Sequence, residues 1–251
     1  MKFSVSTEAV LAKTPILDAI KTVAETGYDA IEFWTWRDKD LPAIVAECAL
    51  RHVEITAFCA KWSQINNPSR HTEYLADLRE TIAAAKNCGT RTLIAVIGDD
   101  TGEAREVQHA AIVKCLRDAA PMLEDAGITA AIEPLNDLYN HKGYYLTRSA
   151  EAFEIVHEVA SPAVKVLYDI YHQQITEGDI INTLTANIAH IAHFHVAGHP
   201  GRNEPDDGEI NYPNIFAAID RTGYTGRVGL EYFPLRDPVE SLRKLLVWDC
   251  P

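Results

Sequence analysis

The chain has 251 residues, 47% of them apolar, and a formal net charge of −13 at pH 7. This negative charge repels nucleic-acid phosphates and anionic lipid surfaces, and the lysines and arginines are scattered singly, so we expect no nucleic-acid or membrane partner. No apolar run approaches the roughly 20 residues that a membrane span needs, and we expect no signal peptide.

The cysteines indicate a protein with reduced thiols. They are odd in number, form no Cys-x-x-Cys pair and mostly lie in apolar segments, which favours core thiols over disulfides or a zinc site. We therefore expect a cytoplasmic protein. The five residues are Cys48, Cys59, Cys88, Cys115 and Cys250.

Short apolar runs alternate along the chain with longer stretches of helical periodicity, and glycine or proline marks most of the junctions. The expected strands cover residues 3–6, 30–33, 54–58, 92–96, 129–133, 164–169, 191–196 and 227–231. The first expected helix starts at residue 15 and stops at Gly27, and the others cover residues 41–51, 69–87, 104–126, 149–159, 180–187, 213–222 and 238–247.

Eight strands, each followed by a helix, predict a single (β/α)8 TIM barrel domain over residues 1–251. An open doubly wound sheet usually has only about five or six strands. It would also predict a glycine-rich phosphate turn after the first strand, where Ser6-Thr7-Glu8-Ala9 offers none. In a barrel, catalytic groups come from the C-terminal ends of several strands.

Charged side chains stand at the ends of four consecutive expected strands. Glu133 ends the fifth strand, Asp169 the sixth, His195 the seventh and Glu231 the eighth. Gathering carboxylates in a partly dry pocket is very unfavourable unless a cation compensates them, so the sequence predicts a bound divalent metal. One imidazole among hard oxygen ligands suits Mn²⁺, Mg²⁺ or Co²⁺, whereas catalytic zinc sites more often have several histidines.

Three further residues are expected to contact the substrate. His172, just beyond the sixth strand, is close enough to donate a hydrogen bond to a substrate oxygen. Arg202, in the polar loop after the seventh strand, suits bidentate recognition of a substrate carboxylate. Glu32 ends the second strand and is interpreted as a substrate ligand or as a support for the other site residues.

Other polar and aromatic residues near these strand ends are interpreted as support or packing. His193 lies two residues before the strand-seven histidine, so it points the same way but deeper into the barrel. The tryptophans Trp34, Trp36 and Trp62 follow the second and third strands and are candidates for the pocket wall.

Over its whole length the chain resembles the xylose isomerase-like barrel superfamily, and within it the hydroxypyruvate isomerase group. The motifs are IEPLN at residues 132–136, YDIYH at 168–172, PGRNEP at 200–205, GEINY at 208–212 and GLEY at 229–232. The resemblance implies that Glu133 and Glu231 are both metal ligands and the proton-transfer pair, with Asp169 and the strand-seven residue completing the metal shell. Hydroxypyruvate isomerases usually carry glutamine there, whereas His195 is what the related ketose 3-epimerases carry.

The resemblance implies proton abstraction from a carbon next to a carbonyl, with the metal stabilising an enediolate. Returning the proton to the adjacent carbon converts hydroxypyruvate to tartronate semialdehyde. Returning it to the same carbon from the opposite face is the reaction of a D-tagatose or D-psicose type ketose 3-epimerase. An inosose or dehydroshikimate dehydratase takes the same kind of proton before expelling a hydroxyl, and the sequence leaves these alternatives open.

Endonuclease IV-type repair enzymes share this barrel, but a resemblance to them would imply a site with several zinc ions and many more histidines than this sequence offers. They also need a basic face, which a net charge of −13 disfavours. A non-enzymatic barrel that only binds sugar or metal is disfavoured, because it would not need two glutamates facing each other across the site. Barrels of this superfamily often pair, so a homo-oligomer is an expectation by analogy only.

Overall fold

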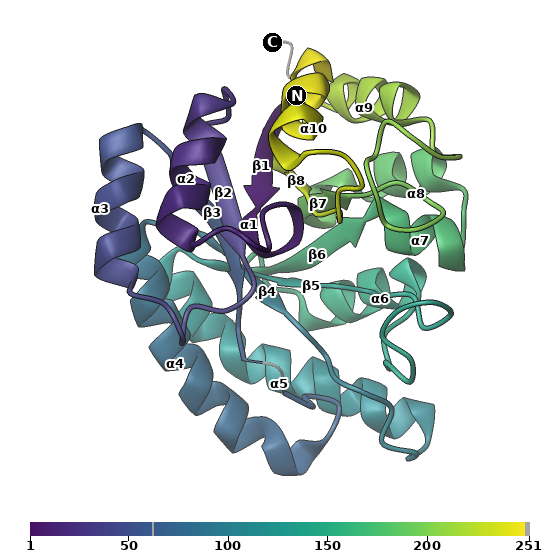
Figure 1. The fold of residues 1–251 in the computed structure, drawn as a ribbon. Helices are drawn as coiled ribbons and strands as arrows, with labels where there is room; N and C mark the ends of the chain where they lie inside the picture. Colours follow the sequence, from purple (N-terminus) through teal and green to yellow (C-terminus); the bar gives the residue numbers. More distant parts are fainter. Residues whose placement is uncertain (62, 249–251) are drawn as a thin grey trace.

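The structure, a computed structural model, describes residues 1–61 and 63–248, so Trp62 and Cys250 lie outside the described residues. Its centre is a closed barrel of parallel strands in sequence order, in which β8 pairs with β1 (Figure 1). This confirms the expected (β/α)8 barrel. The strands are β1 (Lys2–Ser6), β2 (Ala30–Phe33), β3 (Glu54–Cys59), β4 (Thr92–Ala95), β5 (Thr129–Ile132), β6 (Val164–Asp169), β7 (Ile191–Val196) and β8 (Arg227–Leu230).

Helices connect the strands and cover the outside of the barrel (Figure 1). The eight expected helices are α2 (Ile16–Glu25), α3 (Leu41–Arg51), α4 (His71–Cys88), α5 (Arg105–Ala126), α6 (Ser149–Val159), α8 (Ile180–Ala186), α9 (Tyr212–Arg221) and α10 (Pro238–Leu245). Short 3-10 turns are η1 (Pro68–Arg70), η2 (Ile188–His190) and η3 (Leu246–Trp248). Helices α4 and α5 end at Gly89 and Gly127, both left-handed, a conformation that glycine adopts without steric penalty.

Two short helices are present that the sequence analysis did not predict, α1 (Thr7–Val10) and α7 (Ile170–Thr176). Each begins directly after a strand, with no glycine or proline at the junction. Asp169, the last residue of β6, caps α7, because its Oδ1 accepts hydrogen bonds from the backbone N–H groups of Tyr171 at 2.8 Å and His172 at 3.2 Å. The same side chain therefore ends the strand and begins the helix.

The barrel interior has an apolar side and a polar side. The apolar side is a small buried cluster from β3 to β6, formed by Ala57, Ile94, Ala131 and Leu167. The polar side comes from β1, β2 and β7 and contains buried Ser4, Glu32, His193 and His195. A larger apolar core fills the space between the barrel and the helices, as expected for parallel strands covered on both faces.

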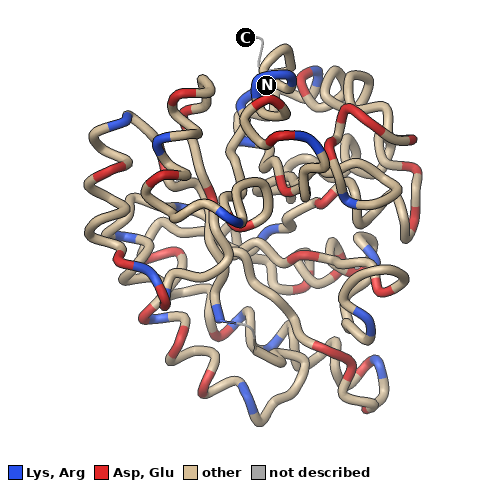
Figure 2. Tube along the Cα trace, viewed as in Figure 1, with Lys and Arg blue, Asp and Glu red and all other residues tan. Residues whose placement is uncertain are grey.

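Charged residues of both signs alternate along the outer helices, and no extended basic stretch is seen in the view of Figure 2. Neighbours on a helix pair with one another, as Lys114 and Asp118 do at 2.7 Å. Among the helices of the described part of the chain, none is both long and apolar enough to span a membrane. Four of the predicted reduced thiols are free cysteines, namely Cys48, Cys59, Cys88 and Cys115.

Candidate active site

The four charged strand ends meet at the C-terminal mouth of the barrel. Glu133 directly follows β5, Asp169 ends β6, His195 lies next to the end of β7 and Glu231 directly follows β8. All four are buried, and one potential ligand atom of each lies within 4.8 Å of the others. Because parallel barrel strands end at one rim, residues far apart in the sequence share one site.

His195 occupies the centre of this cluster. Its Nδ1 lies 3.6 Å from Glu133 Oε1 and 3.4 Å from Glu231 Oε2, whereas its Nε2 lies 3.3 Å from Glu32 Oε2. Burial lowers the pKa of His195, but the charges of Glu231 and Glu32 outweigh it, so the pKa is raised well above its usual value. In the metal-free protein the carboxylates thus hold a proton on the imidazole.

The two carboxylates nearest to the guanidinium of Arg202 differ in their environments. Glu231 accepts hydrogen bonds from the indole Nε1 of Trp34 at 2.6 Å and from Arg202. Burial alone would raise its pKa, but His195 and Arg202 lower it below the usual range. For Asp169 burial outweighs the attraction of Arg202 and raises the pKa to about 7. Near neutral pH the cluster therefore contains one firmly ionised carboxylate and one that is still titrating.

Unpartnered buried atoms indicate that a cation fits among the four residues. Among the described residues, Glu133 Oε1 and His195 Nδ1 are buried without a hydrogen-bond partner. These two atoms lie 3.6 Å apart, too far for a hydrogen bond, and face the same space. Carboxylate oxygens and an imidazole nitrogen are ordinary ligands of divalent cations, so the chemistry of this donor set fits a metal held by Glu133, Asp169, His195 and Glu231.

Arg202 reaches the cluster from the loop between β7 and α9. Its backbone is left-handed, with a φ of 59°, and its side chain is buried. One Nη atom pairs with Glu231 and lies 3.8 Å from Asp169 Oδ2. Among the described residues, its Nε has no partner, and the residue lines a cavity of about 690 Å³ at the mouth of the barrel. The guanidinium therefore balances negative charge and retains a donor for a ligand.

His172 lies on α7, fully buried behind Asp169. Its Nδ1 accepts a hydrogen bond from the backbone N–H of Asn136 at 3.0 Å, which places the ring proton on Nε2 in the neutral form. Nε2 lies 3.5 Å from Asp169 Oδ2. Burial, together with the positive charge of Arg202, lowers the pKa of His172 well below its usual value. The structure thus presents His172 as a neutral Nε2 donor beside the cluster.

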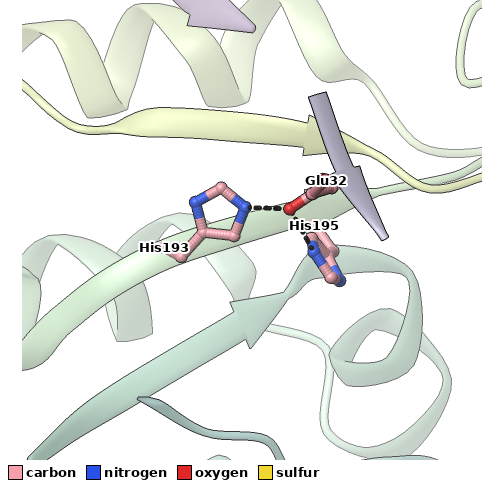
Figure 3. Close-up of side chains that lie close together, drawn as sticks. All are labelled: Glu32, His193 and His195. Carbon is pink, nitrogen blue, oxygen red and sulfur yellow. Dashed lines mark hydrogen bonds and ion pairs between the residues drawn. The ribbon is translucent and has the colours of Figure 1, made fainter. Parts of the chain in front are cut away.

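Glu32 is near the other predicted site residues but on the far side of His195. Its Oε2 lies 2.9 Å from His193 Nε2 and 3.3 Å from His195 Nε2 (Figure 3). Burial would raise its pKa, but the charges of His195 and His193 lower the pKa to about 2. Glu32 is not among the residues that line the cavity at the barrel mouth. From the sequence, Glu32 is interpreted either as a substrate ligand or as a support for other site residues. The geometry favours the second role, because Glu32 contacts His195 and not the cavity.

The cavity of about 690 Å³ opens above the cluster. Its lining includes Glu133, Arg202, Glu231, Trp34, Trp36, Cys59, Lys61, Ile94, Val96, Leu135, Asn140, His141 and Phe233. The sequence pattern around Cys59 favours a core thiol, yet Cys59 is the last residue of β3 and therefore stands at a strand end, as the other site residues do. The side chain contact of Trp34 with Glu231 gives no local sequence signal, because the two residues meet only through the barrel.

Comparisons with known proteins agree with this fold. A family model described as "Xylose isomerase-like TIM barrel" matches residues 20–248. Hydroxypyruvate isomerase of Escherichia coli K12 is 31% identical, with 97% of each chain covered. A 2-oxo-tetronate isomerase of Cupriavidus necator is 30% identical, with 93% of each chain covered. The chain is also similar to a crystal structure described as AP endonuclease, family 2, from Brucella melitensis, with a TM-score of 0.94, 29% identity and 98% of each chain covered.

Proposed function

Because the chain belongs to the xylose isomerase-like TIM barrel family and is an isomerase, we propose that it isomerises a small 2-oxo acid with a hydroxyl on the neighbouring carbon. Hydroxypyruvate, giving tartronate semialdehyde, is the first candidate substrate, and 2-oxo-tetronate belongs to the same chemical class. One observation carries the proposal: Glu133, Asp169, His195 and Glu231 bring potential ligand atoms within 4.8 Å of one another at the base of a cavity.

These four residues would hold a divalent cation, for which Mn²⁺, Mg²⁺ and Co²⁺ are the candidates. When bound, such a cation supplies a Lewis acid that makes the hydrogen beside the substrate carbonyl more acidic. The four residues would fix the position of the cation, because they come from four neighbouring strands of a rigid barrel.

Glu133 and Glu231 are the groups that move the proton. Glu231 is held by Trp34 and Arg202, whereas Glu133 Oε1 has no hydrogen-bond partner among the described residues. Glu133 is therefore the better placed base, because a carboxylate oxygen without a donor is free to accept a substrate proton. In an isomerisation this proton returns to the adjacent carbon.

Arg202 and His172 would orient the substrate. The partnerless Nε of Arg202 belongs to a guanidinium that lines the cavity, which suits the carboxylate of a 2-oxo acid. The Nε2 of His172 is also buried without a hydrogen-bond partner among the described residues. His172 does not line the cavity, so it would donate only to a substrate oxygen that enters the cluster beside Asp169.

A ketose 3-epimerase is the second candidate. A cavity of about 690 Å³ is roomy for a three-carbon acid and also accommodates a six-carbon ketose. In that reaction Glu133 and Glu231 would act on opposite faces of one carbon. A repair nuclease is less well supported, because the outer helices carry mixed charges and the whole chain has a net charge of −13.

The test is a turnover assay of the metal-free protein with and without added Mn²⁺, Mg²⁺ or Co²⁺. The panel contains hydroxypyruvate, 2-oxo-tetronate, D-tagatose, D-psicose, an inosose, dehydroshikimate and a DNA duplex with one abasic site. We expect metal-dependent isomerisation of a 2-oxo acid. Formation of an epimerised ketose, a dehydrated product or cleaved DNA would contradict the proposed reaction and identify an epimerase, a dehydratase or a nuclease instead.

Glu133→Gln and Glu231→Gln test the proton-transfer pair within the same assay. Each should lower kcat by roughly 10²- to 10⁴-fold while leaving the circular dichroism spectrum unchanged. Glu151→Gln is the matched control, because Glu151 is a partly buried glutamate on α6 that accepts a hydrogen bond from the Tyr145 hydroxyl at 2.8 Å. Substantial activity of either site variant would contradict the paired-carboxylate mechanism.

A further inference from the structure

We propose that Glu32 and His193 are positioning residues that hold His195 in the orientation and tautomer needed to bind a metal. The inference deepens the proposed function and rests on it for the metal site. It concerns residues that do not line the cavity, so they would act on the reaction only through His195.

A continuous set of buried contacts supports this role. Glu32, His193 and His195 are 2%, 3% and 1% exposed. A single carboxylate oxygen, Glu32 Oε2, lies between the Nε2 atoms of His193 at 2.9 Å and His195 at 3.3 Å (Figure 3). Since this oxygen only accepts, each imidazole donates from Nε2. The charge of a buried carboxylate is thereby paired with two donors.

The barrel wall is shaped to admit this carboxylate. A Cβ at Gly229 on β8 would lie 2.0 Å from Glu32 Oε1 and 2.6 Å from Cδ2 of His195. No real side chain tolerates such distances, so only glycine leaves room for both groups. On β1, the Ser4 hydroxyl lies 3.5 Å from the same Oε1. Residues of β1, β7 and β8 therefore enclose the Glu32 carboxylate, which comes from β2.

The position of the proton on His195 has a direct consequence for the site. Once the imidazole is neutral, donation from Nε2 to Glu32 leaves the lone pair on Nδ1, the edge that lies 3.6 Å from Glu133 and 3.4 Å from Glu231. A carboxylate behind a metal-binding histidine also raises the basicity of the ring and fixes its orientation. His193 in turn keeps the Glu32 carboxylate directed between the two rings.

The same three residues also have the composition of a metal site of their own, with potential ligand atoms within 4.8 Å of one another. The hydrogen bonds from His193 and His195 to Glu32 Oε2 explain why the three residues lie together, and they leave this oxygen with two partners without any metal. A metal there would also need Nε2 of His195, and that would move the ring proton to Nδ1, the edge that faces the other carboxylates. We therefore assign the three residues to one metal site as its support.

Calorimetric titration of metal-free protein with Mn²⁺ tests the inference without any substrate. Glu32→Gln removes the negative charge at nearly constant shape and should weaken Mn²⁺ binding by about 10- to 100-fold. The matched control is Glu151→Gln, because Glu151 also has a histidine partner, with His109 Nδ1 at 3.3 Å from its Oε1, but lies on α6 outside the barrel. This control should bind Mn²⁺ as the unaltered protein does.

His193→Phe is the second variant, since it keeps a ring of similar size without the donor. We expect its Mn²⁺ affinity to lie between those of the unaltered protein and Glu32→Gln. Unchanged affinity in a folded Glu32→Gln variant would overturn the inference. Binding of two Mn²⁺ ions by the unaltered protein would also overturn it, because the three residues would then form a second metal site.

Nitrogen-15 NMR of the histidine rings provides a measurement that needs no variant. In the Mg²⁺-loaded protein, His195 should carry its proton on Nε2, and a proton on Nδ1 would overturn the inference. The outcomes separate from those of the proposed function. Weakened Mn²⁺ binding by Glu32→Gln in a protein without isomerase activity would support the inference and contradict the reaction, whereas unaltered affinity in an active isomerase would do the reverse.

Discussion

The two sides of the barrel interior solve the problem of burial differently. On the side formed by β3 to β6 the buried residues are small or branched apolar side chains, with Ala57, Ile94, Ala131 and Leu167 in mutual contact. On the opposite side a carboxylate and two imidazoles are buried just as fully. The first side is stabilised by close packing and the second by hydrogen bonds between its own members.

This difference explains how an acidic chain supports a charged site inside its core. An isolated buried charge is very unfavourable, but Glu32 has two ring donors and His195 faces carboxylates on both edges. The apolar side has no such requirement and gives the cavity part of its wall through Ile94. We therefore expect damage to the two sides to have different consequences.

The largest effect on stability is expected on the apolar side. Ile94→Ala removes a branched side chain that is 3% exposed, and it should lower the free energy of unfolding by about 2–5 kcal/mol. Because the apolar side chain of Ile94 offers neither a ligand atom nor a hydrogen bond to the four residues of the metal site, the dissociation constant for Mn²⁺ should change by less than about twofold. Urea denaturation and calorimetric titration measure the two quantities. A large loss of Mn²⁺ affinity in this variant would contradict the idea that only the polar side of the barrel interior supports the metal site.

A smaller loss of stability, with a clear loss of metal affinity, is expected on the polar side. Gly229→Ala places a methyl group where Glu32 Oε1 and the ring of His195 already lie. Such overpacking lowers stability by about 1–3 kcal/mol. Since the displaced groups are those that hold the metal ligand, Mn²⁺ binding should weaken as well. Full retention of Mn²⁺ affinity in a folded Gly229→Ala protein would show that the close approach at β8 is irrelevant to the site.

The mildest perturbation is a change of pH. The pKa of Asp169 is raised to about 7, and that of His195 is also raised, so the metal-free protein carries protons that a metal must displace. Mn²⁺ affinity should therefore rise with pH, by up to about tenfold per pH unit for each proton released, and level off once these groups have lost their protons. The raised pKa of Asp169 also means that its protonation stabilises the folded metal-free protein, and this contribution is lost as the pH rises toward 7.

Calorimetric titrations between pH 5.5 and 8 check this dependence, with the pH values chosen to bracket the raised pKa by about one unit or more. Affinity that does not depend on pH would mean that neither group binds a proton in competition with the metal.

The strand ends show how far the sequence alone leads. Glu133, Asp169, His195 and Glu231 were found because each interrupts or closes an apolar run, and the barrel brings all four together. Arg202 and His172 were found from their loops and lie beside the same cluster. Their assignment to metal and substrate stays a prediction until the variants are measured.

Other features had no readable signal. Helix α7 begins without a break because Asp169 serves both as a strand end and as a cap, and short helices lack the periodicity that reveals longer ones. The partners of Glu32 come from β7 and the space for it from β8, so nothing near Glu32 in the sequence indicates its contacts. Cys59 differs from these, because its place at the end of β3 is a readable signal, although its apolar neighbours favour the interpretation as a core thiol.

The sequence by itself determined the alternation of strands and helices and the charge that each strand carries at its end, because periodicity and punctuation are local properties of the chain. Only the tertiary structure decided which of those charges meet and which edge of His195 faces which carboxylate. That decision depends on the closure of β1 against β8 and on one glycine at residue 229, since distances between strands are set by the barrel and not by separation along the chain.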